Sequence, residues 1–201
     1  MRTAKVDSPT KEKLLDAAQR LMLAKGFVAT TVDEICDEAS LTKGSFFHYF
    51  KSKDHLGQAV LDRFVSTKQQ AIQKGPFLKM RDPLQRVYGY LDFIIEMSKS
   101  PAAPPSCLLG NFAQELSNTH PKIRTQCATY FAKWAEQFKR DLDEAKKQYA
   151  PHTPIDTRSL AEHFIAVLEG ALILAKAKQE REPIEEHLQH FKRYVKSQFG
   201  R

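Results

Sequence analysis

Cysteine, glycine and proline are scarce in this chain of 201 residues, which has three, eight and ten of them respectively. Three cysteines with no Cys-x-x-Cys pair exclude a disulfide framework and argue against a zinc ribbon. The low glycine and proline content excludes collagen-like and linker-rich chains. No apolar run approaches the ~20 residues needed to cross a bilayer, and the polar N-terminal stretch lacks the apolar core of a signal peptide. We therefore expect a cytoplasmic protein with free thiols and no membrane partner.

The residues that are present favour a globular helical protein. Apolar residues make up 42% and charged residues 27%, and the formal net charge of +7 permits a polyanionic partner. Apolar positions recur at helical spacing, as in Leu14, Ala18, Leu21 and Met22, and no Asn-Gly or Asp-Gly hairpin signal is present. The sequence predicts an all-α fold of about nine helices. Their expected ranges are 10–25, 32–39, 43–49, 53–74, 83–98, 106–118, 121–148, 156–180 and 184–199.

Residues 30–53 carry the most informative pattern. Thr31 followed by Glu34 is a capping box that opens a short helix. Thr42 can cap a second helix, which follows after a tight turn. Two short helices joined by such a turn form a helix-turn-helix, here over about residues 31–50.

The second of these helices has two faces. Phe46 and Phe50 can pack inward, whereas the other face offers hydroxyls, an imidazole and lysine, which suit phosphate oxygens and base edges. Gly44 would let the backbone approach a surface closely. Lys53 opposes the dipole of the next helix, which a phosphate partner would explain. The candidate DNA-contacting residues are Thr31, Thr42, Lys43, Gly44, Ser45, His48, Tyr49 and Lys53. The alternative is a helical bundle in which the aromatic residues are all core.

Residues 10–64 contain several short motifs in a specific order. These are Lys13-Leu14-Leu15-Asp16-Ala17-Ala18, Lys25-Gly26-Phe27, Thr30-Thr31-Val32, Ile35, Ala39, Lys43-Gly44-Ser45-Phe46, Tyr49-Phe50 and Ser52-Lys53-Asp54-His55-Leu56. Together they resemble the DNA-binding domain of TetR-family transcriptional regulators. Phe47 departs from the family, which usually has tyrosine there, so one hydroxyl often offered to phosphate is missing.

The resemblance implies an all-α homodimer with two domains. A helix-turn-helix DNA-binding domain would occupy residues 1–55, and an effector-binding and dimerisation domain would occupy residues 56–201. The implied function is that of a repressor, released from double-stranded, pseudo-palindromic operator DNA by a small molecule or an electrophile. The implied dimer is formed by the last two long helices.

Two apolar stripes on those last helices fit the implied dimer, because paired stripes can form a four-helix seam. The residues expected at the interface are Phe164, Leu168 and Leu172 on one helix, and Leu188, Phe191 and Val195 on the other. The alternative is that both stripes pack within one protomer.

One cysteine is a candidate sensor. The stretches around Ser106 to Asn111 and Glu169 to Lys176 resemble the TetR-family branch of the N-ethylmaleimide reductase repressors, some of which respond to electrophiles. That likeness implies a reactive Cys107 with a nearby Lys176. Ser106 would cap a helix and place the thiol in its first turn, where the dipole and an ammonium lower a thiol pKa. The alternative is an inert thiol, and Cys36 and Cys127 are expected to be structural.

A conventional effector cavity is the other interpretation. Aromatic residues spread over three middle helices could line an apolar cavity, although such residues at helical spacing also form cores. The candidates are Tyr88, Phe93, Phe112 and Trp134. The sequence names no effector.

No motif for catalysis, for a cofactor or for a metal is present in the sequence. Glycine-rich phosphate loops, zinc-protease signatures and nucleophile elbows are missing, and His187 with His190 alone is a weak metal signal. The remaining enzyme hypothesis is a Cys107-dependent peroxidase or transferase. Turnover would distinguish it, because a sensor reacts once per thiol.

Overall fold

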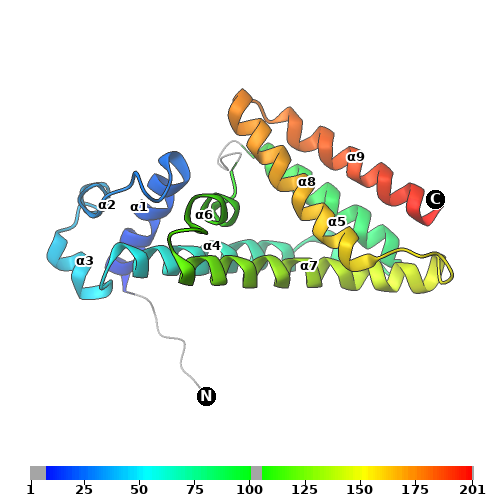
Figure 1. The fold of residues 1–201 in the computed structure, drawn as a ribbon, viewed down its shortest axis with the longest axis horizontal. Helices are drawn as coiled ribbons and strands as arrows, with labels where there is room; N and C mark the ends of the chain where they lie inside the picture. Colours follow the sequence, from blue (N-terminus) through cyan, green and yellow to red (C-terminus); the bar gives the residue numbers. More distant parts are fainter. Residues whose placement is uncertain (1–7, 101–105, 201) are drawn as a thin grey trace, which may run out of the picture. The chain divides into compact units, whose positions relative to one another are not determined.

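The computed structural model describes residues 8–100 and 106–200, and within these ranges it contains helices and turns but no strand. The all-α prediction is confirmed, and each expected helix end falls within two residues of the observed end. The sequence did not predict the short 3-10 helix η1 that follows Gly75. The elements are α1 Pro9–Lys25, α2 Val32–Ala39, α3 Lys43–Tyr49, α4 Lys53–Gln73, η1 Pro76–Lys79, α5 Pro83–Lys99, α6 Leu108–Leu116, α7 Pro121–Tyr149, α8 Thr157–Lys178 and α9 Glu182–Phe199 (Figure 1).

The chain forms two compact units, which differ from the expected division after residue 55. The first unit contains the chain up to Lys68 and also Leu108–Cys127, whereas the second contains Gln69–Cys107 and the chain from Ala128 onward. The difference arises because α6 packs against the segment that follows α1. Each unit is therefore built from separate stretches of sequence.

The first unit has a small apolar core beneath the α2–turn–α3 pair. Phe46 and Phe50 of α3 are buried, as predicted, together with Ile35 of α2. Phe27, which follows α1, meets Phe112 of α6 edge-on with ring centroids 5.5 Å apart. Burying large side chains of this kind stabilises a fold by about 1.5–3 kcal/mol each.

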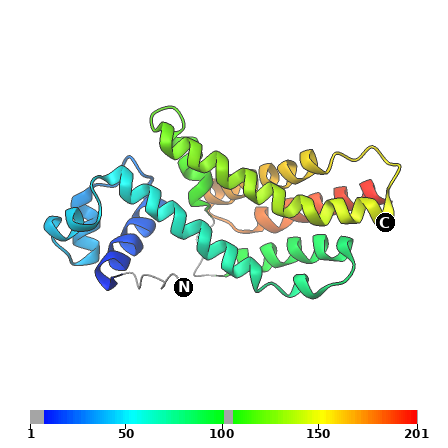
Figure 2. The same cartoon turned by 90° about the horizontal axis from the view of Figure 1, so that it is seen from below.

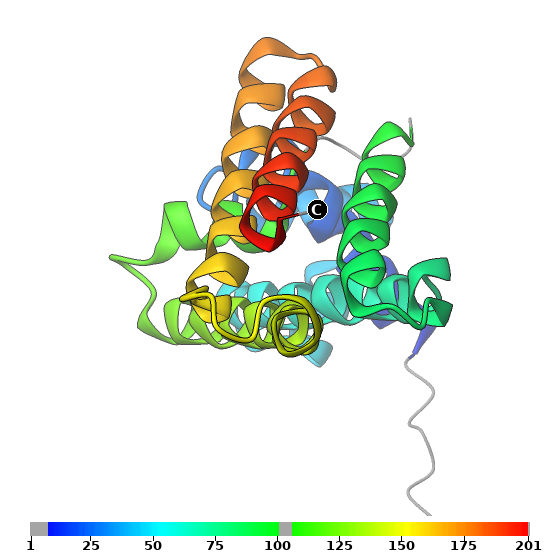
Figure 3. The same ribbon diagram turned by 90° about the vertical axis from the view of Figure 1, so that its right-hand side faces the viewer.

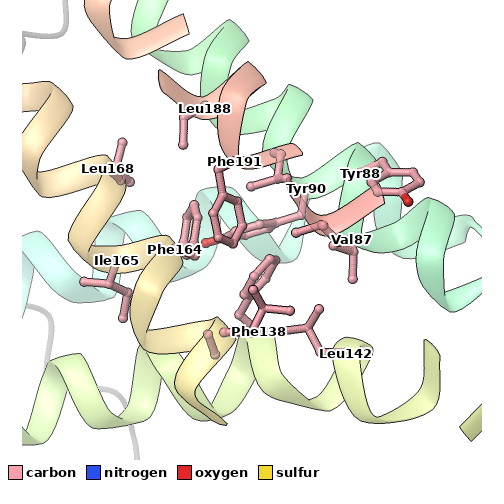
Figure 4. Close-up of a cluster of buried hydrophobic side chains, with 14 of the residues drawn as sticks. Val87, Tyr88, Tyr90, Phe138, Leu142, Phe164, Ile165, Leu168, Leu188 and Phe191 are labelled. Atoms are coloured by element: carbon pink, nitrogen blue, oxygen red, sulfur yellow. The ribbon is translucent and has the colours of Figure 1, made fainter. Parts of the chain in front are cut away.

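The second unit has a larger, aromatic core. Phe138 of α7, Phe164 of α8 and Phe191 of α9 lie together around Tyr90 of α5 (Figure 4). The indole Nε1 of Trp134 donates a hydrogen bond of 2.7 Å to the Tyr90 hydroxyl, so this buried oxygen has a partner.

The helices that supply this core lie side by side. α8 and α9 form an antiparallel pair, and α5 also contacts α9 (Figure 3). The turn of η1 packs against α5 (Figure 2). Asp82 begins α5 by accepting a hydrogen bond of 2.9 Å from the Gln85 backbone N–H, a favourable N-terminal cap.

Candidate nucleic-acid interface and thiol site

The predicted caps fix the geometry of the α2–turn–α3 pair. The Thr31 side chain and Glu34 form the reciprocal capping box at the start of α2. Thr42 Oγ1 accepts a hydrogen bond of 3.2 Å from the Ser45 backbone N–H at the start of α3. Between them Ser40 has φ 53°, a left-handed conformation that turns the chain sharply. Since both helices are capped by local side chains, the sequence determines this motif locally.

The outward face of α3 carries most of the expected DNA contacts. Thr42, Lys43, Gly44 and His48 are exposed, and Ser45 is half-buried. A Cβ atom added at Gly44 would meet only Thr42 Oγ1, at 3.5 Å. Nothing within the described protein therefore requires glycine at this position.

Asp33 and Glu34 of α2 are paired with lysines. Lys43 Nζ lies 2.7 Å from Asp33 Oδ1, and this hydrogen bond raises the lysine pKa. Lys25 bonds to Glu34 and lowers the pKa of that carboxyl to about 2, with the Thr31 backbone N–H also contributing. A phosphate approaching α3 would compete with Asp33 for the Lys43 ammonium.

Lys53 has an intramolecular role that the sequence analysis missed. Its ammonium donates to the backbone carbonyls of Phe27, Val28 and Thr30 at 3.1, 3.3 and 2.9 Å. It also lies over the Phe27 ring, 4.6 Å from the centroid. These contacts explain a lysine at the start of α4 without a phosphate partner, which corrects the argument from the helix dipole.

Tyr49, the last of the candidate contacts on α3, is half-buried. Its hydroxyl lies 2.9 Å from Ser8 Oγ, just before α1. Phe47, where the family usually has tyrosine, is 56% exposed on the same helix. The aromatic residues of α3 thus divide between a buried face and an exposed one.

A carboxylate on α6 holds the segment that follows α1. The two Glu115 oxygens accept hydrogen bonds of 2.8 Å each from the backbone N–H groups of Phe27 and Val28. Gly26 has φ 89°, and a Cβ there would lie 3.0 Å from Glu115 Oε2. We call this arrangement the Glu115 clamp. It joins residues almost ninety positions apart. The only signal of it in the sequence is Gly26, whose position indicates a left-handed backbone conformation.

Cys107 differs from its expected surroundings. It is half-buried and precedes α6 instead of lying in its first turn. Its thiol shares a hydrogen bond with the Glu169 carboxyl. Lys176 is exposed, about two turns further along α8. A carboxylate beside a thiol disfavours the thiolate, the opposite of the expected effect of lysine.

Glu169 is itself unusual. Burial raises its pKa to about 7, although the hydrogen bond with Cys107 acts in the lowering direction. Its Oε1 is buried and has no hydrogen-bond partner among the described residues. The Glu169 carboxyl therefore keeps its proton to a higher pH than an ordinary glutamate.

The other two cysteines are buried. Burial raises the pKa of Cys127 to about 11, and burial with the nearby Asp33 raises that of Cys36. Both thiols therefore stay protonated and unreactive at neutral pH.

The four residues expected to line an apolar cavity are divided between the two units, three of them in or against the aromatic core of the second. Phe112 belongs to the first unit, against Phe27. Phe93 and Trp134 pack against the aromatic core of the second unit. Only Tyr88 lines a described cavity, which is open and partly polar.

The six residues expected at a dimer interface lie in or against the core of the second unit. Five of the six residues are buried in the core of their own protomer and Leu172 packs against it, so the intramolecular alternative accounts for them. The periodicity of α8 and α9 shows that each helix has one apolar face. It does not show whether that face packs within the protomer or against a partner. On the solvent side, Ile173, Leu174 and Tyr194 are 49%, 41% and 46% exposed.

Two further observations concern the described residues. None of their helices is both long and apolar enough to cross a bilayer. Nor do they contain a cluster of three or more histidine, cysteine or acidic side chains that could hold a metal ion.

Family profiles match both parts of the chain. The profile described as "Bacterial regulatory proteins, tetR family" matches residues 14–60. The one described as "Tetracyclin repressor-like, C-terminal domain" matches residues 83–191, more than half of the chain. The chain belongs to the TetR family.

Relatives within the TetR family cover almost the whole chain. The HTH-type transcriptional repressor DhaR of Mycobacterium sp. (strain GP1) is 29% identical over 90% of this chain and 89% of its own. The crystal structure of a regulatory protein TetR from Rhodobacter sphaeroides has a TM-score of 0.81 at 26% identity, covering 92% and 98% of the two chains. The reduced form of Escherichia coli NemR has a TM-score of 0.76 at 24% identity, covering 92% and 96%.

These likenesses support a DNA-binding transcriptional regulator. The TetR-like fold has an N-terminal helix-turn-helix and a C-terminal helical domain, as the sequence predicted. NemR, a transcriptional repressor, is among the relatives and the structural neighbours, which agrees with the resemblance of the C-terminal half.

Proposed function

We propose that this TetR-family protein is a cytoplasmic, homodimeric repressor that binds a palindromic operator through α3 and is released by an effector. The observation that carries the proposal is the exposed polar face of α3 on a rigid, capped and buried support. A dimer presents two such helices, which can enter successive major grooves one helical turn apart.

The proposed DNA contacts divide by role. Lys43 would bind phosphate after exchanging Asp33 for it, and His48 with the Thr42 and Ser45 hydroxyls would face phosphate oxygens or base edges. The remaining contacts are Thr31, Gly44 and Tyr49. Lys53 positions the segment that carries Thr31 through its three carbonyl contacts.

The proposed dimer uses the solvent side of α8 and α9. Ile173, Leu174 and Tyr194 are large apolar side chains exposed on adjacent helices, and such patches typically mark an interface. A charged residue in place of Ile173 should convert the dimer to a monomer in sedimentation experiments. The matched substitution of exposed Val28 should leave its mass unchanged.

The proposed switch acts through the chain connection at Cys107. This residue ends one stretch of the second unit, and Leu108 begins α6 of the first. An electrophile bound to the Cys107 sulfur would add bulk directly before α6, shift Glu115 on that helix and weaken its hold on the backbone N–H groups of Phe27 and Val28. To release DNA, modification must favour the non-binding state by a few kcal/mol.

A footprint tests the regulator and the switch together. The reduced protein is placed on DNA from immediately upstream of its own gene, with and without N-ethylmaleimide, as wild type, Cys107→Ser and Cys127→Ser. We expect a protected palindrome that alkylation abolishes in wild type and Cys127→Ser but not in Cys107→Ser. If alkylation leaves the protection unchanged, the thiol switch is contradicted. If no DNA site is protected at all, the repressor function is contradicted. Repeated turnover of a peroxide or transfer substrate, with the Cys107 thiol regenerated each time, would instead favour a thiol-dependent enzyme.

Lys43 provides a separate test of the interface. Lys43→Ala should weaken binding to all DNA sequences by a similar factor and reduce the slope of log affinity against log salt by about 1. The control is Lys147→Ala on α7. Equal affinities and slopes in the two variants would remove Lys43 from the interface.

A further inference from the structure

The second unit contains an open cavity at which α5, the end of α7 and α9 meet. Its volume is about 370 Å³. Met80, Leu84 and Gly89 supply apolar wall, and Asp82, Asp92, Lys192 and Lys196 supply charge. Tyr88 and Tyr149 complete the main polar lining. This cavity is distinct from the Cys107–Glu169 pair.

Both carboxylates in the wall are already engaged. Asp92 accepts hydrogen bonds of 2.7 and 2.8 Å from the Lys192 ammonium. Asp82 accepts from the Gln85 backbone N–H and from the Tyr149 hydroxyl. Both carboxylates of the cavity therefore already accept hydrogen bonds from groups of the protein itself.

Two hydrogen-bond donors in the same wall are not committed. Tyr88 is only 7% exposed, yet its hydroxyl has no hydrogen-bond partner among the described residues. Its ring, turned away from the centre of the aromatic core (Figure 4), lies 5.5 Å from Lys196 Nζ. Within the described chain no carboxylate pairs with that ammonium.

An unpartnered hydroxyl at this depth destabilises the fold unless something accepts its hydrogen bond. Burial and the nearby Asp82 raise the pKa of Tyr88, so the phenol keeps its proton. A neutral phenol and an ammonium are both donors, and they match a ligand that only accepts. Lys192 also lies over the Tyr88 ring, at 5.7 Å, so the local field disfavours a cation.

We propose that this cavity binds a small organic carboxylate. Its oxygens would accept hydrogen bonds from the Tyr88 hydroxyl and the Lys196 ammonium, and its apolar body would lie against Met80 and Leu84. As a binding site this proposal stands alone, whereas its role as an effector site rests on the proposed repressor function. The apolar wall distinguishes the ligand from inorganic phosphate, which has no apolar body to bury.

Calorimetric titration of the full chain with benzoate tests the site. The comparisons are benzamide, which has the same shape without the charge, and inorganic phosphate, which has charge without an apolar body. We expect benzoate to bind at least about tenfold more tightly than either. Equally tight binding of benzamide would contradict the requirement for a negative charge on the ligand. Equally tight binding of phosphate would contradict the requirement for an apolar body.

Two variants connect this binding to the proposed residues. Lys196→Met and Tyr88→Phe should each weaken benzoate by about tenfold or more. Tyr88→Phe removes only the unpartnered hydroxyl, so its melting temperature should rise or stay unchanged while binding falls. A purely structural tyrosine would not give these opposite effects. Lys133→Met is the matched control, since Lys133 also lies over a tyrosine ring, 5.8 Å from that of Tyr130. Equal affinities in the two methionine variants would contradict the proposal.

An operator titration separates the two proposals. Benzoate should weaken operator binding by wild type but not by Lys196→Met. If benzoate binds as expected but the protein protects no operator, the cavity stands and the repressor function fails. If the operator is bound and benzoate is not, the repressor stands and the cavity proposal fails.

Discussion

Each unit of this protein has its own apolar core, but the contacts between distant segments that stand out within each unit differ in kind. In the first, charged side chains reach backbone groups: Glu115 accepts from two N–H groups, and Lys53 donates to three carbonyls. In the second, aromatic rings pack around Phe164, with centroids of Phe138 and Phe191 at 4.7 and 5.8 Å. Directional contacts fail after a small displacement, whereas apolar packing resists one by exclusion of water and close contact.

This difference indicates in which unit a segment can be displaced with the smaller loss of free energy. A small displacement of α6 would lengthen both hydrogen bonds of the Glu115 clamp, which weaken steeply with distance and angle. The same displacement within the aromatic core would open a cavity, which costs several kcal/mol. We infer that the polar contacts of the first unit yield to a small displacement more readily than the aromatic core of the second unit.

The largest expected effect breaks the aromatic core of the second unit. Phe164→Ala should lower the free energy of unfolding by about 3–5 kcal/mol, because it removes the ring at the centre of the cluster and leaves a cavity. The measurement is urea denaturation followed by circular dichroism. Phe47→Ala on the exposed face of α3 is the control and should change stability little. A loss below 1 kcal/mol for Phe164→Ala would contradict an aromatic core of this importance.

The next effect concerns Glu169, a carboxyl with a raised pKa in the second unit. The pKa of Glu169 is about 7 in the folded protein against an ordinary 4.5, so the folded state holds a proton that the unfolded state loses earlier. Stability from this group is fully present below about pH 4.5 and is lost as the pH rises through 7, by up to about 3 kcal/mol. Glu169→Gln should remove this loss, so that its advantage over wild type grows from pH 5 to pH 8. Parallel stability curves would contradict the raised pKa.

A somewhat smaller effect tests the Glu115 clamp. Glu115→Ala should destabilise the first unit by about 2 kcal/mol, because two backbone N–H groups lose a charged acceptor. Hydrogen exchange at Phe27 and Val28 should accelerate, while exchange in α8 should change little. The control is Gln114→Ala, one residue earlier on α6. Uniform acceleration across both units would show that they unfold together and would weaken the comparison.

The smallest expected change in stability is that of Gly44→Ala, which should also weaken operator binding. Gly44→Ala has room for its Cβ and replaces a poor helix former, so the free energy of unfolding should rise by up to about 1 kcal/mol. If the α3 backbone approaches DNA at this point, operator affinity should fall in the same variant. Unchanged affinity, measured by fluorescence anisotropy, would place Gly44 outside the interface.

Sequence patterns predicted what depends on neighbouring residues. The Thr31 and Thr42 caps, the helix ends and the inward direction of Phe46 and Phe50 follow from spacings of three or four residues. These contacts form within one turn of helix, so periodicity and capping chemistry contain them.

Sequence patterns did not specify the contacts between distant segments. The Glu115 clamp and the Cys107–Glu169 pair join residues more than sixty positions apart, and no local pattern specifies either partner. Periodicity left open both a dimer interface and an intramolecular core for the stripes with Phe164 and Phe191, because a helix that covers its own core has the same periodicity as one that covers a partner. Lys53 was interpreted from its position on the helix, without the loop that it holds.

The assembly of the first unit from two stretches has a consequence for exchange of domains between relatives. A crossover after Lys68 would transfer the helix-turn-helix but leave Leu108–Cys127 behind. The backbone N–H groups of Phe27 and Val28 would then meet whatever residue the recipient carries at the position of Glu115. A functional chimera must therefore transfer both stretches, or keep a glutamate at that position of the recipient. The segments that must be exchanged together are those joined by hydrogen bonds, even though they are not contiguous in the sequence.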